Sequence, residues 1–170
     1  MNTIVALKLI VLTMFTSLIG DSGIQIPAMP DCDKIRHGND VVCTACNIYH
    51  EARSETFRGE IAVANVTRNR VDSDRFPDKF CQVVWQRKQF SWTKDGKSDR
   101  VRNPDAWQEA YLIAFITVNG YKQGKSYFED DTHGSLWYHA DYVRPIWSHK
   151  IKPAAIIGKH EFYTSIALHK

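Results

Sequence analysis

The fold is decided by residues 40–71, which read DVVCTACNIYHEARSETFRGEIAVANVTRNRV. In the first part, apolar residues recur at three- and four-residue spacing, which predicts an amphipathic helix beginning near Asn39 or Asp40, either of which could cap it. The second part, residues 56–71, is apolar around much of its circumference. A helix with that pattern is expected to be buried at the centre of its domain.

A third helix is predicted to follow Asn103. This residue is a good cap, Pro104 suits the first turn, and Asp105 is favourable beside the positive end of the helix dipole. Apolar residues then mark one face of the helix, and Asn119-Gly120 is expected to end it. The polar and aromatic segment between the second and third helices, residues 76–102, is expected to form loops.

The helical period is lost after the third helix. Residues 136–141 and 159–163 resemble short strands, joined through a segment that contains Pro145 and Pro153. We therefore expect one α+β domain over residues 40–170, with helices first and a small antiparallel sheet late.

The chain begins with a segment typical of export. Residues 9–19, LIVLTMFTSLI, are apolar, follow Lys8, and are too short to cross a bilayer comfortably. We predict that residues 1–23 are a signal peptide or membrane anchor, that residues 24–39 are a linker, and that the protein is exported to the periplasm or cell wall. Contact with a membrane is expected only through this segment.

Composition excludes several classes of protein. The 170 residues are 44% hydrophobic and 24% charged, which is typical of one globular domain and not of a disordered or membrane-embedded chain. The net charge of +3 is too small to indicate nucleic-acid binding. Aromatic residues make up 12%, and their rings suit stacking on sugars as well as packing in a core.

Four cysteines follow the export segment: Cys32, Cys43, Cys46 and Cys81. An even number in an exported protein predicts up to two disulfides, with three possible pairings. Cys43-x-x-Cys46 could also form half of a zinc site, but no second pair of ligands at suitable spacing completes it.

Glu51, near the end of the first helix, is a candidate acid. Its neighbours Ile48, Tyr49 and Ala52 are mainly apolar, and loss of hydration would raise the pKa of its carboxyl group and let it donate a proton. Taken alone, a glutamate on a helix is more often solvated or paired, here with Arg53 or Arg58. His50-Glu51 is not a metalloprotease motif, because Ser54 stands where the second histidine is required.

Two stretches combine aromatic rings with amides, hydroxyls and carboxylates. They are QFSWTKDGKSDR, residues 89–100, and YHADYVRPIW, residues 138–147. Such mixtures line saccharide grooves, although Trp92 and Trp147 could equally be core residues. Ser91, His139 and Asp141 could be drawn as a hydrolase triad, but no G-x-S-x-G turn surrounds the serine.

These segments together resemble the cell wall hydrolase family typified by bacterial spore cortex-lytic enzymes. The likeness covers residues 42–163 in the family's order. It is carried by NIYHEARSE (47–55), IAVANVTRNRV (61–71), RFPDKFCQVV (75–84), the two mixed stretches, and IGKHEFY (157–163).

The resemblance implies a lysozyme-like fold of the lytic transglycosylase type, with peptidoglycan glycan strands as substrate. It implies cleavage between N-acetylmuramic acid and N-acetylglucosamine, with Glu51 as the catalytic acid and base, and a disulfide between Cys43 and Cys81. It leaves the pairing of Cys32 and Cys46 open. No cofactor or metal is expected, no nucleic acid is an expected partner, and we expect a monomer.

Further residues are expected to bind the sugars or shape the groove: Gln89, Ser91, Trp92, Asp95, Tyr138, His139, Tyr142 and Trp147. Three alternatives stay open. A second carboxylate, from Glu60, Asp95 or Asp141, could activate water and make the enzyme a hydrolytic muramidase or glucosaminidase. The protein could instead be a metal-dependent amidase or peptidase acting on the stem peptide, or a wall-binding module without catalysis.

Overall fold

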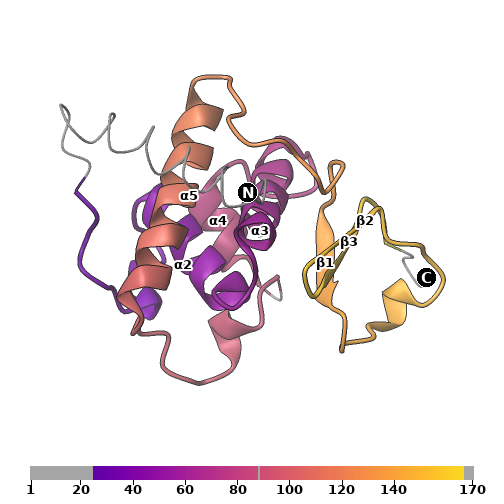
Figure 1. The fold of residues 1–170 in the computed structure, drawn as a ribbon, viewed down its shortest axis with the longest axis horizontal. Helices are drawn as coiled ribbons and strands as arrows, with labels where there is room; N and C mark the ends of the chain where they lie inside the picture. Colours follow the sequence, from indigo (N-terminus) through magenta and orange to yellow (C-terminus); the bar gives the residue numbers. More distant parts are fainter. Residues whose placement is uncertain (1–24, 88, 167–170) are drawn as a thin grey trace, which may run out of the picture.

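The computed structural model describes residues 25–87 and 89–166. Helices come first and a small antiparallel sheet comes late, as predicted (Figure 1). The α-helices are α2 (Asp40–Ala52), α3 (Phe57–Asp72), α4 (Phe80–Trp85) and α5 (Pro104–Lys122). The strands are β1 (Trp137–Ala140), β2 (Ala155–Ile157) and β3 (His160–Tyr163), and the 3-10 turns are η1 (Cys32–Ile35), η2 (Trp92–Lys94) and η3 (Ile146–Ser148).

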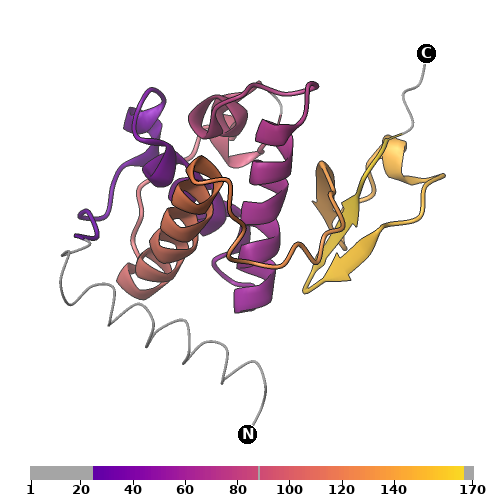
Figure 2. The same cartoon turned by 90° about the horizontal axis from the view of Figure 1, so that it is seen from above.

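Helix α3 is the centre of the domain, as its all-round apolar pattern predicted. It contacts α2, α4 and α5 and also touches β2, so it separates the other helices from the sheet (Figure 2). The main core lies among the four helices. A second, smaller cluster joins α3 to the sheet through Ala62, Val66, Ile157 and Phe162.

The caps that the sequence indicated at Asn39 and Asn103 are present, and Thr56 caps the helix between them. Asn39 accepts the N–H of Val41, Thr56 accepts that of Gly59, and Asn103 accepts those of Asp105 and Ala106. These side chains satisfy backbone donors that have no partner within the helix, which fixes where each helix begins.

Two expectations about helices were wrong. Residues 76–102 are not all loop, because Phe80, Val83 and Val84 bury one face of the short helix α4. Helix α5 also continues past Gly120 to Lys122. Gly120 lies within the helix because the chain returns against it: a Cβ there would stand 2.8 Å from a ring carbon of Tyr127.

The sheet has three strands in the order β1-β3-β2, all antiparallel. Strands β1 and β3 agree with the two predicted segments, whereas β2 was missed because its three residues are too few to show alternation. The turn between β2 and β3 rests on the helical side. There the carboxylate of Glu55 accepts the backbone N–H of Lys159 and fills the space where a Cβ of Gly158 would lie.

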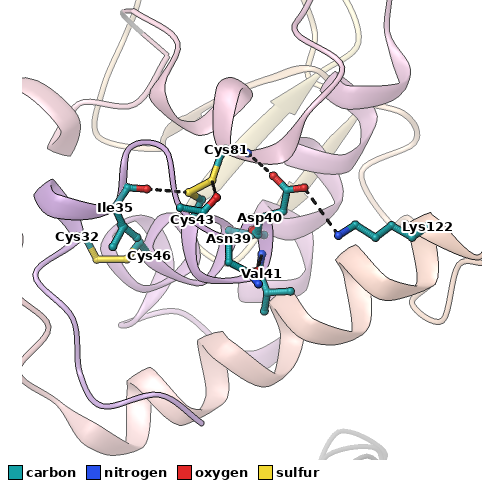
Figure 3. Close-up of a disulfide and its surroundings, with 11 residues drawn as sticks. Cys32, Ile35, Asn39, Asp40, Val41, Cys43, Cys46, Cys81 and Lys122 are labelled. Atoms are coloured by element: carbon teal, nitrogen blue, oxygen red, sulfur yellow. Dashed lines mark hydrogen bonds and ion pairs between the residues drawn. A yellow bond between two sulfur atoms is a disulfide. The ribbon is translucent and has the colours of Figure 1, made fainter. Parts of the chain in front are cut away.

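Both disulfides hold the start of α2 (Figure 3). Cys43–Cys81 joins it to α4, which is the pairing that the resemblance implied, and Cys32–Cys46 joins it to η1. Since all four thiols are consumed, the zinc alternative for Cys43 and Cys46 is wrong. Asp40 adds a further tie by accepting the N–H of Cys81 and lying 3.9 Å from the ammonium of Lys122.

The segment expected to be a linker is attached to the domain over part of its length. Cys32 is fully buried, and Asp31 forms a β-bridge with Arg100. The predicted signal or anchor, residues 1–23, lies outside the described residues. Over residues 25–87 and 89–166, none of the helices combines the length and the apolar character that a membrane span requires.

Candidate active site

A cleft of about 770 Å³ lies where the end of α2 meets the loop before α5 and the strands β1 and β3. We call it the Glu51 cleft. It is lined by Glu51 and by seven of the eight residues predicted to bind sugars, namely Gln89, Ser91, Trp92, Asp95, Tyr138, His139 and Tyr142. Trp147, the eighth, is not among its lining residues.

Glu51 stands in the last turn of α2, where the helix carries its carboxyl group into the cleft. The Tyr138 hydroxyl, from strand β1, donates a hydrogen bond of 3.1 Å to its Oε2. Burial raises the pKa of Glu51 to about 7, although the Tyr138 hydrogen bond and the charge of Arg70 both lower it. The carboxyl group therefore keeps its proton to a much higher pH than an exposed glutamate does.

Arg70 is a buried cation beside this carboxyl group, and the sequence analysis did not identify it. It lies in the last turns of α3, donates from Nε to the Leu136 carbonyl at 2.8 Å, and is only 3% exposed. Its guanidinium also lies over the rings of Phe76 and Phe90. Burial lowers its pKa to about 10, so it stays charged at neutral pH and favours the ionised form of Glu51. No pattern in the sequence distinguishes Arg70 from the other charged residues of α3, such as Arg58 and Arg68.

Trp92 is mainly a core residue, the alternative that the sequence left open. It is 5% exposed, and its indole N–H donates to Asn47 Oδ1 at 3.1 Å. His50 stacks on it with ring centroids 4.7 Å apart. These three residues form a rigid floor next to Glu51, and only part of the indole lines the cleft.

His139 and Trp147 form a cluster with Tyr163. The two nitrogens of His139 lie 2.9 Å from the Ala140 carbonyl oxygen and 3.0 Å from the Tyr163 hydroxyl. Trp147 meets both rings edge-on. The ring nitrogens of His139 are thus engaged within the sheet, and Asp141 does not line the cleft, so the Ser91–His139–Asp141 triad is not assembled.

The remaining predicted residues lie at the mouth of the cleft. Tyr142 is 82% exposed just after β1, where its ring is free to stack on a ligand. Ser91 and Asp95 are exposed, and Gln89 is half-buried. The carboxylate of Asp95 forms a hydrogen bond within its own loop, where it accepts the backbone N–H of Lys97.

Other lining residues were also missed by the sequence analysis. His160, from β3, is 7% exposed, and burial lowers the pKa of its imidazole, which keeps it neutral. Arg53, Arg100 and Arg102 add positive charge to the cleft. Asp99 is buried, and this burial together with a hydrogen bond to Asp33 raises its pKa. Throughout the described parts of the chain, no three His, Cys, Asp or Glu side chains are grouped so as to hold a metal ion.

The geometry defines a class of site. One largely buried carboxyl group, protonated to a large extent near neutral pH, faces an open and mainly polar cleft. Such a group is suited to giving and taking a proton on a polar polymer that lies across it.

Comparison with known proteins places the chain in a family. Residues 54–163 match the sequence profile of the family described as Cell Wall Hydrolase, and the chain belongs to this family. Glu51 lies just before the matched segment.

Relatives include two enzymes named spore cortex-lytic enzyme. The one from Oceanobacillus iheyensis is 36% identical over 127 residues, which is 73% of this chain and 41% of that protein. The one from Bacillus subtilis is 34% identical over 125 residues, covering 73% of this chain and 37% of that protein. The chain thus spans about two fifths of the length of these relatives.

Two solved structures share the fold. The catalytic domain of the germination-specific lytic transglycosylase SleB from Bacillus anthracis matches with a TM-score of 0.57 and 29% identity, over 72% of this chain and 92% of that one. The SleB catalytic domain from Bacillus cereus matches with a TM-score of 0.57 and 26% identity, over 84% and 98%. The α+β fold implied by the resemblance is therefore confirmed.

Proposed function

We propose that this protein cleaves the glycan strands of peptidoglycan between N-acetylmuramic acid and N-acetylglucosamine, as a lytic transglycosylase with Glu51 as its acid and base. The observation that carries the proposal is the position of Glu51, whose largely buried carboxyl group faces a polar cleft and has a pKa raised to about 7. The names of the relatives support the same substrate and reaction.

The first step is protonation of the bridging oxygen. The Glu51 carboxyl group donates its proton as the bond from the anomeric carbon of muramic acid to that oxygen breaks, and the N-acetylglucosamine part leaves as an alcohol. A positioned acid of suitable pKa contributes typically 10²–10⁴-fold to such a step. Positive charge then develops on the sugar ring, and the new Glu51 carboxylate offsets it.

The second step closes a ring within the same sugar. The Glu51 carboxylate takes the proton of the muramic C6 hydroxyl while that oxygen bonds to the anomeric carbon. The product is a 1,6-anhydro sugar, Glu51 is again protonated, and no water is consumed. Because the attack is intramolecular, little entropy is lost in reaching the transition state.

Residues around Glu51 have distinct supporting roles. Tyr138 orients the carboxyl group through its hydrogen bond, and Arg70 stabilises the carboxylate between the two steps. Gln89 and Ser91 would bind hydroxyl or acetamido groups, and the exposed ring of Tyr142 would stack on a sugar.

Hydrolysis, in which a second carboxylate activates water, is the second candidate. Of Glu60, Asp95 and Asp141, only Asp95 lines the Glu51 cleft. It is exposed and engaged with Lys97, so nothing prepares it to activate water.

Analysis of the products decides between these reactions. Purified peptidoglycan is digested with wild type and with Glu51→Gln, and the muropeptides are identified by mass spectrometry. Anhydro-muramic ends from wild type, lost in the variant, support the proposal. Reducing ends would indicate hydrolysis instead. Cleaved stem peptides with activity abolished by EDTA would indicate an amidase or peptidase, and binding without products would indicate a wall-binding module.

A further inference from the structure

A group of arginines along one side of the Glu51 cleft has no part in the reaction described above. Arg53, Arg100 and Arg102 all line the cleft and are exposed. We call them the basic edge. None of them takes part in an ion pair between described residues. Exposed arginines without a carboxylate partner in a binding cleft are available for an anionic ligand.

The backbone under the basic edge is held firmly. The Tyr49 hydroxyl accepts the N–H groups of Arg102 and Asn103, both at 3.1 Å, and the Arg53 guanidinium lies over the Tyr49 ring at 5.2 Å. One buried tyrosine therefore positions two of the three arginines. The basic edge is thus a preformed feature of the fold, which reduces the entropy lost when a ligand binds.

Arg100 is fixed from the other side by the segment before α2. It pairs with Asp31 in a β-bridge, and on either side of it Cys32 donates to the Asp99 carbonyl and Val101 donates to the Pro30 carbonyl. The Cys32–Cys46 disulfide anchors this segment to α2, as Figure 3 shows. This disulfide therefore links the arginine-bearing loop to the helix that carries Glu51.

The acidic side chains of the cleft do not neutralise the basic edge. Asp95 is paired with Lys97. Asp99 is buried and hydrogen-bonded to Asp33, and both its burial and this hydrogen bond raise the pKa of its carboxyl group. On the reacting side, Glu51 lies beside Arg70, and the charge of Arg70 favours its ionised form.

The chemistry of the glycan identifies what the basic edge would bind. The sugar rings carry hydroxyl and acetamido groups, which are neutral and need only polar partners. Negative charge in peptidoglycan lies on the lactyl branch of muramic acid, either as the carboxylates of a stem peptide or, where the peptide is missing, as the lactyl carboxylate itself. Arginine matches a carboxylate with two parallel hydrogen bonds.

We propose that Arg53, Arg100 and Arg102 form a subsite for carboxylates on the lactyl branch of muramic acid, which makes the enzyme selective for glycan strands whose lactyl branches carry negative charge. This inference rests on the proposed function, because it assigns a specificity to the same cleft. The subsite acts on binding of the substrate and leaves the proton transfers of Glu51 unchanged.

The test compares three soluble, uncrosslinked glycan substrates freed of teichoic acids. The first bears intact stem peptides, the second has its peptide carboxyl groups converted to amides with carbodiimide and ammonia, and the third has lost its peptides to an amidase. Release of anhydro ends is measured with wild type, Arg102→Gln, Arg102→Lys and the control Arg87→Gln. Arg87 is also exposed and does not line the cleft.

With wild type, we expect amidation to raise KM about tenfold, the effect of losing one well-formed charged hydrogen bond, with little change in kcat. Arg102→Gln should raise KM similarly on the intact substrate and cause little further rise on the amidated one. Arg102→Lys should recover part of the loss, and Arg87→Gln should resemble wild type. On the peptide-free substrate, a KM like that of intact strands identifies the lactyl carboxylate as the ligand, and a higher KM identifies the peptide carboxylates.

Equal KM values of wild type for intact and amidated strands would overturn the subsite. So would an equal loss from Arg102→Gln on both substrates, which would indicate a structural role. If wild type releases no glycan fragments from any of the three substrates, the proposed function itself is wrong.

Discussion

The two halves of the molecule are stabilised in different ways. The helical half has a large apolar core and both disulfides, whereas a small cluster of four buried apolar side chains, with Tyr138 and Ala155 packed against it, joins the sheet half to α3. The interior of the sheet half is partly polar, with buried His139, His160 and Tyr163. The helical half provides the acid Glu51, and the sheet half provides Tyr138, whose hydroxyl donates a hydrogen bond to the Glu51 carboxylate.

Because of this difference, some residues of the site lie on firmly held segments and others lie on the less tightly packed sheet. Glu51, Arg70 and the basic edge lie on segments fixed by helices, by Tyr49 or by a disulfide. Tyr138, His160 and Tyr142 belong to the sheet side, where fewer apolar contacts hold the backbone. Elements with few buried contacts open more readily than the core. We therefore expect changes in the helical half to alter catalysis or global stability, and changes in the sheet half to alter how well the carboxyl group is oriented.

The largest effect is expected from Glu51→Gln. The amide cannot donate a proton to the glycosidic oxygen, so kcat should fall by about 10²–10⁴-fold while peptidoglycan binding remains. Turnover is measured on purified sacculi, with Glu129→Gln as a control because Glu129 is exposed and does not line the cleft. Dissolution of sacculi at the parental rate by Glu51→Gln would remove Glu51 from the mechanism.

Removing the disulfides should destabilise the helical half to different extents. Cys43–Cys81 closes a separation of 38 residues and Cys32–Cys46 one of 14. Loop entropy predicts a loss of about 4 kcal/mol of unfolding free energy for the double variant Cys43→Ala/Cys81→Ala and about 3 kcal/mol for Cys32→Ala/Cys46→Ala.

Urea unfolding of the two double variants measures these losses. The second variant has a further consequence, because it releases the segment that fixes Arg100. It should raise KM for peptide-bearing strands, whereas the first should not. An equal KM change in both variants would contradict the link between the Cys32–Cys46 disulfide and the basic edge.

The third expected effect is a pH-dependent stabilisation by Glu51→Gln. The pKa of Glu51 is raised from 4.5 to about 7 by folding, so the folded state holds this proton more tightly than the unfolded chain does. Below about pH 4.5 the Glu51 carboxyl group is protonated in both the folded and the unfolded state, so it does not reduce the free energy of unfolding. As the pH rises toward 7, ionisation of the unfolded chain reduces stability, by at most about 3 kcal/mol.

Glu51→Gln removes this cost. Its unfolding free energy relative to wild type should therefore increase between pH 4 and pH 8, as measured by urea titrations at each pH. A difference that stays constant over this range would mean that Glu51 is not buried as described.

The smallest effect is expected on the sheet side, from Tyr138→Phe. The hydroxyl hydrogen bond lowers the pKa of Glu51, so its loss should raise that pKa and move the alkaline limb of the kcat/KM profile to higher pH. Below pH 7 the rate should fall by roughly tenfold or less, the net value of one hydrogen bond. Tyr127→Phe, at an exposed position remote from the cleft, is the control. An unshifted limb would mean that Tyr138 does not contact the acid in solution.

Periodicity and capping chemistry were sufficient to predict most of the helical half. Helix starts are marked by capping residues, which can be recognised from the neighbouring sequence alone, as at Asn39 and Asn103; Thr56 is a cap of the same kind. Gly120 shows the limit, because its role depends on Tyr127 returning against the helix, a contact that no local pattern contains. The same is true of β2, which exists only because β3 pairs with it.

The candidate site was predictable to the extent that it follows local chemistry. Glu51 and most of the aromatic and polar lining residues were found, because they cluster in two mixed stretches and in the family resemblance. Arg70 and His160 were not, because burial decides their importance and burial is a property of the assembled fold. Trp92 and Trp147 were both predicted to shape the groove. In the structure Trp92 lines the cleft, whereas Trp147 packs edge-on against His139.

The turn between β2 and β3 contacts the helical half through the carboxylate of Glu55, which accepts the backbone N–H of Lys159. Gly158, at a φ of +58°, leaves no room between the turn and the carboxylate of Glu55, four residues after Glu51. An added methyl group at position 158 would displace the Glu55 carboxylate, which is the far end of a flexible side chain, and would weaken its hydrogen bond to the N–H of Lys159. A contact outside the cleft therefore helps to tie the turn between β2 and β3 to the segment that follows α2.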